Sequence, residues 1–396
     1  MTGRACWAVA GLVVLALTLG SCTQGTTGEP EGAAGTGTSA VGVPAGGVHV
    51  QGARFVAGDD AAIRLRGFNH SGAEYACVAG WGVFDAPGST TIAPDVVAAM
   101  AGWRGADAVR IPLNEQCWLG INGVRPAFGG AAYQTAIADL VAKLNAHGLL
   151  AILDLHLSAP GGELSPNPQQ MPDRDHSVEF WRQVAQRFGT NPSVLFDLFN
   201  EPAPFGEADS DRAWRCWRDG GCLLTSVNTG ATYVAAGMNE LISTIRSTGA
   251  RNVVLAGGIN WAETLTMWLA FKPTDPLRNL AAAFHAYSFN TDCASPDCYR
   301  TVLAPLTTRV PLLVGEVGPD LTVGYDQAHA HCEPSDIGMT GFDAELFDWM
   351  DRTGVSYTAW TWNAWPSCWA LIRDWTGTPT SRWGAFLVQR LARSPY

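Results

Sequence analysis

Short apolar runs recur along the chain, and most of them are followed by an amphipathic segment long enough to form a helix. This alternation limits the possible folds more than any other feature. The runs expected to be strands cover 63–69, 108–112, 149–155, 194–199, 252–256, 281–285, 312–316 and 355–361. The helical patterns cover 133–147, 176–188, 233–247, 342–352 and 383–393, and the pattern is weakest after the fifth strand. Eight strands alternating with helices predict an α/β fold, a closed (β/α)8 TIM barrel, with a leading hairpin near 48–56 at its bottom.

The first 22 residues have the pattern of an export signal. A short basic start is followed by an apolar stretch, 5–19, which is too short to span a membrane comfortably. The sequence Leu19-Gly20-Ser21-Cys22 then resembles the lipobox of bacterial lipoproteins, in which the cysteine becomes the lipidated first residue. An ordinary cleaved signal peptide with an incidental cysteine is the alternative. We therefore expect an exported protein, held at the membrane by a lipid on Cys22 or shed from it.

The rest of the chain divides into a tether and one domain. Residues 23–47 consist largely of Gly, Ala, Thr, Ser and Pro, which cannot bury enough surface to fold and predict a flexible linker. Residues 48–396 contain no second linker and no repeat, so they are expected to form a single catalytic domain. The formal net charge of −11, without a basic cluster, argues against a nucleic-acid partner.

The number of cysteines also indicates an exported protein. Without Cys6 and Cys22 eight remain, and an even number in an exported chain indicates disulfides. No C-x-x-C pair and no histidine spacing typical of zinc is present, so neither a metal nor a cofactor is predicted. Barrel closure places consecutive strand-end loops side by side, which limits the possible partners. The predicted pairs are Cys77–Cys117, Cys216–Cys222, Cys293–Cys298 and Cys332–Cys368.

Two glutamates end apolar runs that lie more than 100 residues apart. Glu201 follows the run 194–199 within Asn200-Glu201-Pro202, and Glu316 ends the run 310–315. A single glutamate at a strand end is usually only solvated. At the mouths of two barrel strands, however, two carboxylates can act as acid and nucleophile on one bond. Other polar and aromatic residues end the remaining strands, which a purely structural barrel does not require: Asn69, Arg110, His156, His285, Tyr287, Trp360 and Trp362.

This set of strand-end residues resembles glycoside hydrolase family 5, a family of retaining endo-glycanases that includes cellulases and mannanases. The resemblance covers residue 48 to the C-terminus. Its eight characteristic positions match, in order, Arg110, His156, Asn200, Glu201, His285, Tyr287, Glu316 and Trp360, with Trp362 as the other candidate for the tryptophan. The resemblance implies that Glu316 is the nucleophile and Glu201 the acid/base. The other matched side chains would bind sugar hydroxyls or orient these two carboxylates.

The resemblance implies an endo-acting, retaining hydrolase of β-linked polysaccharide, expected to be a monomer. The default substrate is β-1,4-glucan, and the alternatives are mannan, another β-glucan or the glycan of a glycolipid. Six of the 16 tryptophans fall in predicted loops, where their rings could stack on sugars: Trp81, Trp118, Trp217, Trp261, Trp365 and Trp369. A sugar-binding lipoprotein without catalysis and a structural envelope protein are rival hypotheses. A sugar-binding protein without catalysis would need neither glutamate, and a structural envelope protein would need no tryptophans at the rim. A serine hydrolase is disfavoured because no G-x-S-x-G motif is present.

Overall fold

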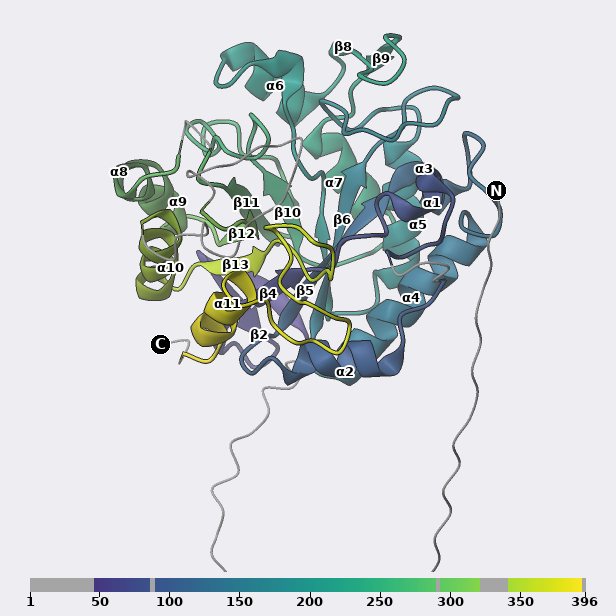
Figure 1. The fold of residues 1–396 in the computed structure, drawn as a ribbon. Helices are drawn as coiled ribbons and strands as arrows, with labels where there is room; N and C mark the ends of the chain where they lie inside the picture. The colour runs from purple at the N-terminus through teal and green to yellow at the C-terminus, as the bar shows by residue number, and fades with distance from the viewer. Residues whose placement is uncertain (1–45, 86–89, 290–292, 321–340, 394–396) are drawn as a thin grey trace, which may run out of the picture. The chain divides into compact units, whose positions relative to one another are not determined.

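A computed structural model describes residues 46–85, 90–289, 293–320 and 341–393. Eight parallel strands close into a barrel whose ring order follows the chain, and the last strand pairs with the first (Figure 1). The barrel strands are β4 (Arg66–Asn69), β5 (Ala108–Asn114), β6 (Leu150–Leu157), β7 (Val194–Asp197), β10 (Val254–Gly257), β11 (Leu280–Ala286), β12 (Leu312–Val317) and β13 (Ser356–Ala359). The predicted (β/α)8 barrel is confirmed.

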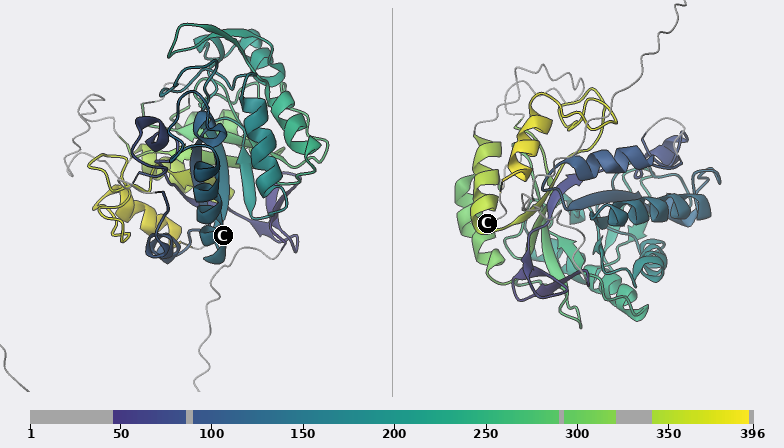
Figure 2. Two further views of the ribbon diagram at one scale, coloured as in Figure 1. Left: turned by 90° about the vertical axis from the view of Figure 1, so that its right-hand side faces the viewer. Right: turned by 90° about the horizontal axis from the view of Figure 1, so that it is seen from below.

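Helices surround the barrel, as both turned views in Figure 2 show. The longer ones are α2 (Pro94–Gly102), α4 (Ala131–Ala146), α5 (Ser177–Phe188), α7 (Met238–Ser247), α10 (Phe342–Thr353) and α11 (Trp383–Leu391). Each presents an apolar stripe to the strands. On α5, for example, Phe180, Trp181, Val184 and Phe188 recur every three or four residues and are buried. This burial against the sheet stabilises the outer layer of the barrel.

Short elements decorate the loops. They are α1 (Ala76–Ala79), α3 (Glu115–Leu119), η1 (Pro204–Gly206), α6 (Asp211–Asp219), β8 (Leu223–Thr225), β9 (Thr232–Val234), α8 (Pro296–Cys298), η2 (Tyr299–Leu303) and α9 (Ala304–Thr307). The longest such insertion follows β7, and its α6 and β8–β9 hairpin lie at the upper end of the barrel in Figure 1. The loops that follow the strands therefore build up one rim, as expected for a barrel of this class.

A small sheet closes the opposite end. Strands β1 (Val48–Gln51) and β2 (Arg54–Ala57) form an antiparallel hairpin, and β3 (Ala62–Ile63) adds to β2. Val48 and Phe55 pack against the inward side chains Ala108, Leu150 and Leu195 of the barrel. The predicted hairpin is thus present and covers the bottom of the barrel interior.

Several predicted boundaries were wrong. The first predicted strand, 63–69, is split, because β3 pairs with the hairpin and only Arg66–Asn69 joins the barrel. The helix predicted from 233 begins at Met238, since Tyr233 lies in β9 and pairs with Leu224. No helix forms between β10 and β11 in the described chain. Helices α2 and α6 were not expected from the periodicity.

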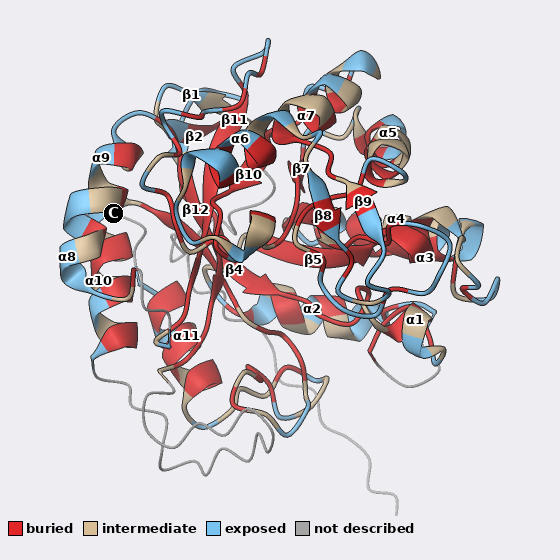
Figure 3. Cartoon of the chain, turned by 90° about the horizontal axis from the view of Figure 1, so that it is seen from above, coloured by how far each residue is buried: buried red, intermediate tan, exposed pale blue. Residues whose placement is uncertain are grey.

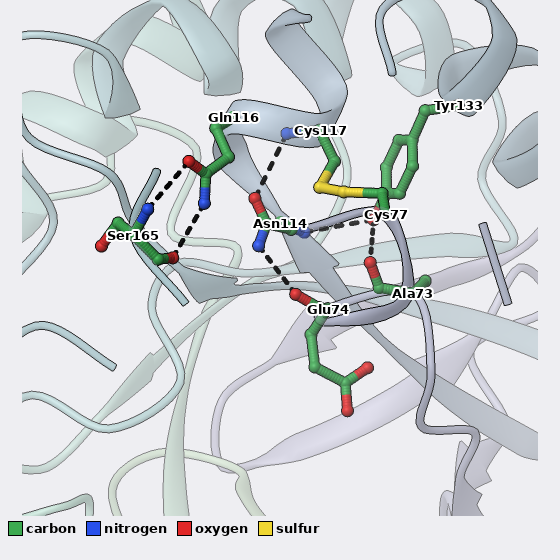
Figure 4. The surroundings of a disulfide bond; sticks show 8 residues. All are labelled: Ala73, Glu74, Cys77, Asn114, Gln116, Cys117, Tyr133 and Ser165. Atoms are coloured by element: carbon green, nitrogen blue, oxygen red, sulfur yellow. Dashed lines mark hydrogen bonds between the residues drawn. A yellow bond between two sulfur atoms is a disulfide. The ribbon is translucent and has the colours of Figure 1, made fainter. Parts of the chain in front are cut away.

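Three of the four predicted disulfides are present. Cys77–Cys117 links the loop after β4 to α3 after β5, with the two Cα atoms 6.2 Å apart (Figure 4). Cys216–Cys222 and Cys293–Cys298 each close a short stretch within one loop. Cys332 lies outside the described residues, so the Cys332–Cys368 pair stays a prediction. Disulfides of this kind restrict the unfolded chain and hold the rim loops in place.

Among the residues that the structure describes, no helix is both long and apolar enough to cross a membrane.

Candidate active site

Polar side chains replace apolar ones in the upper part of the barrel interior. Side chains of a strand alternate between its two faces. On β5, Ala108 joins the inner apolar cluster at the bottom, while Val109 packs outward in the cluster that includes the helices. Arg110 therefore points inward, above Ala108. The same alternation turns Asp154 of β6 and Asp197 of β7 toward it. Figure 3, which views the barrel from above, shows these strands as buried.

Arg110 is the centre of this polar layer. It is fully buried, and its guanidinium donates from Nε to Asp197 Oδ2 at 3.0 Å and from Nη1 to Glu316 Oε1 at 2.9 Å. Nη2 lies 3.1 Å from Asp154 Oδ2. A planar guanidinium can hold several carboxylates in fixed directions, which an ammonium group cannot do. Arg110 thus fixes Glu316 and compensates the buried aspartates.

Two asparagines complete the arginine's contacts. Asn69 accepts from Arg110 Nη1 at 3.0 Å and donates to the Gly315 carbonyl at 2.9 Å, directly before Glu316. Asn200 Oδ1 accepts from Arg110 Nη2 at 2.9 Å. Because its oxygen is fixed in this way, the Nδ2 group of Asn200 is the one left to donate to a substrate hydroxyl.

Glu316 is held by three neighbours. In addition to Arg110, the Tyr287 hydroxyl donates to Glu316 Oε2 at 2.5 Å, and His285 Nδ1 lies 3.7 Å from the same oxygen. The registers of β11 and β12 shift between Phe284 and His285, and beyond this shift His285 is paired with Glu316. Arg110 and Tyr287 thus direct a positive charge and a hydroxyl donor at the two oxygens of Glu316, which are the surroundings that a nucleophilic carboxylate needs.

Glu201 has a different environment. Its Oε1 lies 3.0 Å from His285 Nδ1, and 22% of its side chain is exposed, whereas 5% of Glu316 is exposed. Burial raises the pKa of Glu201 to about 7, against the opposing charges of His156 and Arg110. Burial also lowers the pKa of His285 to about 3, so this imidazole is neutral at physiological pH. One carboxylate oxygen of Glu201, one of Glu316 and a ring nitrogen of His285 all lie within 4.8 Å of one another.

The structure separates the two candidate tryptophans. Trp360 stacks on His156, with ring centroids 5.7 Å apart and planes inclined by 16°. His156 Nδ1 lies 2.7 Å from Asp154 Oδ2, so both rings border the polar layer. The Trp360–Thr361 peptide bond is cis. Trp362 is fully buried and stacks on Phe68, within the apolar core. Of the two, Trp360 therefore lies beside the glutamate pair.

Two buried aspartates that contact Arg110 were not among the predicted site residues. Asp154 and Asp197 had no assigned role, although each lies on the inward face in the same alternation as Arg110. Burial raises the pKa of each to about 7 while Arg110 opposes this change. Asp154 lies two residues before His156, and Asp197 lies two residues after Leu195. Residues two apart in a strand face the same side, so this spacing could have predicted that both aspartates point inward.

The six tryptophans predicted for loops differ in burial, and Trp369 is half-buried, with its ring edge-on to Tyr287 at 5.2 Å between centroids. Trp118 and Trp217 are fully buried in α3 and α6, so their prediction as rim platforms was wrong. Trp81, Trp261 and Trp365 are exposed by 44%, 48% and 45%. The Trp261 amide donates to the Pro202 carbonyl at 3.1 Å, which places this residue next to Glu201.

A left-handed turn presents Trp261. It is the middle one of three successive residues with positive φ, Asn260, Trp261 and Ala262, at 53°, 56° and 63°. Such a run of non-glycine residues is strained and marks functional loops. β10 and β4 are opposite in the ring order, so Trp261 and Trp81 belong to loops that follow opposite strands of the barrel.

Comparisons with known proteins agree with this geometry. The chain is 28% identical to the manganese-dependent endoglucanase Eg5A of Phanerodontia chrysosporium over 267 residues, which are 63% of this chain and 60% of that protein. It is 22% identical to a mannan endo-1,4-β-mannosidase of Streptomyces lividans over 330 residues, 81% of this chain and 67% of that protein. The match to the endoglucanase CelA of Streptomyces lividans, at 24% identity, covers 59% of this chain and 42% of that protein. The chain thus spans less than two thirds of the length of both endoglucanases.

Solved structures share the fold. A β-glucanase from Saccharophagus degradans in complex with cellotetraose has a TM-score of 0.63 at 21% identity, covering 87% of this chain and 92% of that chain. The catalytic domain of a Thermobifida fusca endoglucanase has a TM-score of 0.58 at 18% identity. The match covers 88% of this chain and 98% of that chain. The family model of cellulases, glycosyl hydrolase family 5, matches residues 56–365. With most of its length matched by that model, the chain belongs to glycosyl hydrolase family 5.

Proposed function

We propose that this protein hydrolyses internal bonds of a β-linked polysaccharide with retention of the anomeric configuration. The observation that carries the proposal is the spacing of Glu201 and Glu316. A carboxylate oxygen of one lies within 4.8 Å of a carboxylate oxygen of the other. Retaining enzymes hold their carboxyl groups about 5–5.5 Å apart, whereas inverting enzymes need about 6.5–9.5 Å to admit a water molecule.

The surroundings assign the roles. Glu316, held in place by Arg110 and Tyr287, attacks the anomeric carbon and forms a glycosyl-enzyme ester. Glu201 donates its proton to the departing glycosidic oxygen. It then accepts a proton from the water that cleaves the ester. Asn200 Nδ2 donates to the sugar 2-hydroxyl, and Trp360 provides an apolar face for the ring. The new hydroxyl group therefore lies on the same face of the sugar ring as the bond that was cleaved.

Retention is tested by proton NMR of the first-formed sugar. We expect the β-anomer to appear at once and the α-anomer to grow only by mutarotation. This follows because two displacements at one carbon restore its configuration. Early accumulation of the α-anomer would contradict both the mechanism and the close spacing of Glu201 and Glu316.

We propose β-1,4-glucan as the polymer. Two relatives are named endoglucanases, and one structure of the same fold was solved with cellotetraose. The mannosidase relative keeps mannan as the alternative. The test is incubation with carboxymethyl cellulose, mixed-linkage glucan and galactomannan, with product lengths read over time. An endo-acting glucanase releases oligomers of several lengths early. Release of short products from mannan alone would favour the alternative substrate, and release from none would refute the proposal.

Activity should fall as the pH rises through about 7, the pKa to which burial raises Glu201. The sign follows from the acid role, since the first step needs the protonated carboxyl, so kcat/KM drops about tenfold per pH unit above the pKa. The measurement is kcat/KM against pH. An aryl glycoside, whose leaving group needs no proton, serves as the reference substrate. In Glu201→Gln the alkaline limb should disappear. A limb that persists in this variant would assign it to another group.

We also propose the organisation of the N-terminal region. Residues 1–22 would be a lipoprotein signal ending at Cys22, and residues 23–47 a linker to the domain that begins at residue 48. This rests on sequence composition alone, because residues 1–45 lie outside the described chain. We expect Cys22→Ser to move the protein from the membrane fraction to the soluble fraction of its host. An unchanged distribution would exclude the anchor. Monomeric behaviour is likewise proposed and is measured by light scattering.

A further inference from the structure

A second group of ionisable side chains lies in the segments that follow β5 and β6, and it takes no part in the proposed reaction. Glu115 is the first residue of α3 and directly follows Asn114, the last residue of β5. Asp173 and His176 belong to the turn that leads into α5. One potential ligand atom from each of Glu115, Asp173 and His176 lies within 4.8 Å of the others. Both carboxyl groups are fully buried, and the His176 side chain is 25% exposed.

Hydrogen bonds fix this group but leave one oxygen without a partner. Glu115 accepts from the Ala159 amide at 2.8 Å and from the Ser177 hydroxyl. Asp173 Oδ1 accepts from the His176 amide at 2.8 Å. Asp173 Oδ2 is buried and accepts no N–H or hydroxyl of the residues that the structure describes, and the neighbouring carboxyl of Glu115 would satisfy it only by sharing a proton. An unpartnered carboxylate oxygen away from water is costly, so something should satisfy it.

The charges of the group are also not balanced. The ion pairs of Glu115 and Asp173 within the described ranges involve only His176, at 3.9 and 3.7 Å, and no lysine or arginine. Two buried carboxylates this close cannot both be ionised without a positive charge between them. Either a proton shared by the two groups or a bound cation would resolve this.

We propose that Glu115, Asp173 and His176 bind one divalent cation of the Mn²⁺ or Zn²⁺ type. His176 Nδ1 lies 3.9 Å from Glu115 Oε1 and 3.7 Å from Asp173 Oδ1. Atoms that surround an ion at about 2.0–2.3 Å have mutual spacings of this order. A mixed set of two carboxylates and one imidazole suits these cations better than Ca²⁺ or Mg²⁺, which prefer oxygen ligands only.

Coordination requires one change in the group. His176 Nδ1 lies 2.9 Å from the Ala159 carbonyl, a distance that fits a hydrogen bond. With the ion present, Nδ1 is unprotonated, and both Nδ1 and the Ala159 carbonyl oxygen face the ion. The carbonyl then serves as a fourth ligand beside one oxygen each of Glu115 and Asp173.

The ion would join the loops that follow β5 and β6. Glu115 lies at the end of the strand that carries Arg110, and Ala159 lies in the loop that follows His156. A metal between them ties these loops together, as Cys77–Cys117 ties the loops after β4 and β5. Binding to the native state alone also stabilises the fold.

The test uses the whole chain after removal of metals with a chelator. Titration with Mn²⁺ and, separately, with Zn²⁺ is followed by calorimetry, and the melting temperature is measured with and without the ion. We expect one equivalent to bind and the melting temperature to rise. Asp173→Asn and the more exposed His176→Ala should each weaken binding more than about 10-fold. Glu163→Gln, an exposed acid in the same loop, serves as the matched control and should bind as the unchanged protein does.

The catalytic group offers a competing site, because Glu201, His285 and Glu316 are also close enough to hold an ion. Glu316→Gln separates the two sites. We expect Glu316→Gln to retain one equivalent. Loss of binding in Glu316→Gln but not in Asp173→Asn would overturn the proposal. So would the absence of binding to the folded wild-type chain, which would leave the shared proton as the explanation. Circular dichroism of each variant confirms that the chain compared is folded.

Discussion

Replacement of Glu316 or Glu201 by alanine should nearly abolish turnover on polysaccharide, while the fold is retained. Removal of a general acid costs about 10²–10⁴-fold, and removal of the nucleophile should cost at least as much. The reason differs between the variants. Without Glu316 no ester forms, and without Glu201 the leaving oxygen is not protonated. The measurement is kcat/KM on a soluble polysaccharide, with Glu163→Ala as an exposed-acid control that should keep full activity.

Azide should separate the two roles. In Glu201→Ala, azide attacks the ester on Glu316 with a substrate whose leaving group is good, so the product is a β-glycosyl azide. In Glu316→Ala, azide replaces the nucleophile and attacks from the opposite face, so the product is an α-glycosyl azide. NMR of the isolated azides decides between these outcomes. The same stereochemistry from both variants, or the reverse assignment, would mean that the roles of the glutamates are misassigned.

The barrel could be predicted because its strands are buried on both faces. Such strands appear as continuous apolar runs, of which residues 310–314, before Gly315 and Glu316, are a clear case. The boundary error at β4 has a physical reason. The hairpin strand β3 and the barrel strand β4 follow each other within a few residues, and both have an apolar pattern. The sequence shows the pattern but not the sheet to which each strand belongs.

The glutamate pair could also be predicted, whereas the group that supports it could not be predicted in full. Glu201 and Glu316 are recognisable because each ends an apolar run. Asp154 and Asp197 lie inside such runs, and only the inward alternation of their strands shows that both meet Arg110. The helix that contains Trp118 could not be predicted from periodicity, because α3 is five residues long and too short to show a repeat. Tertiary contacts determine these positions.

The proposed metal group illustrates the same limit. Its two carboxylates come from different elements, and neither Glu115 nor Asp173 has a spacing typical of a metal motif. No linear pattern could have predicted it, because the fold brings the end of β5 to the turn before α5.

Arg110→Met should be the most destabilising single change at the site. The substitution leaves Asp154, Asp197 and Glu316 buried without the guanidinium that lies within 3.1 Å of each. Removal of one partner from a buried ion pair costs about 3–5 kcal/mol, because an uncompensated charge stays buried. Urea unfolding at neutral pH measures this cost. Arg215→Met is the matched control. Its ion pair with Asp211 is 65% and 64% exposed, so it should cost at most about 1 kcal/mol.

The pH dependence of this loss identifies its cause. Burial raises the pKa of Asp154 and of Asp197 to about 7 even with Arg110 opposing it, and loss of Arg110 removes that opposition. A carboxyl group whose folded pKa exceeds its unfolded value, about 3.9 for aspartate, favours the folded state at low pH and loses this contribution as the pH rises. The difference in unfolding free energy between Arg110→Met and the wild type should therefore shrink as the pH falls from about 8 to about 5. Adding Asp197→Asn to Arg110→Met should recover part of the loss at the higher pH, since one buried charge is removed. A difference that stays constant with pH, or grows toward acid, would show that lost packing rather than uncompensated charge destabilises the variant.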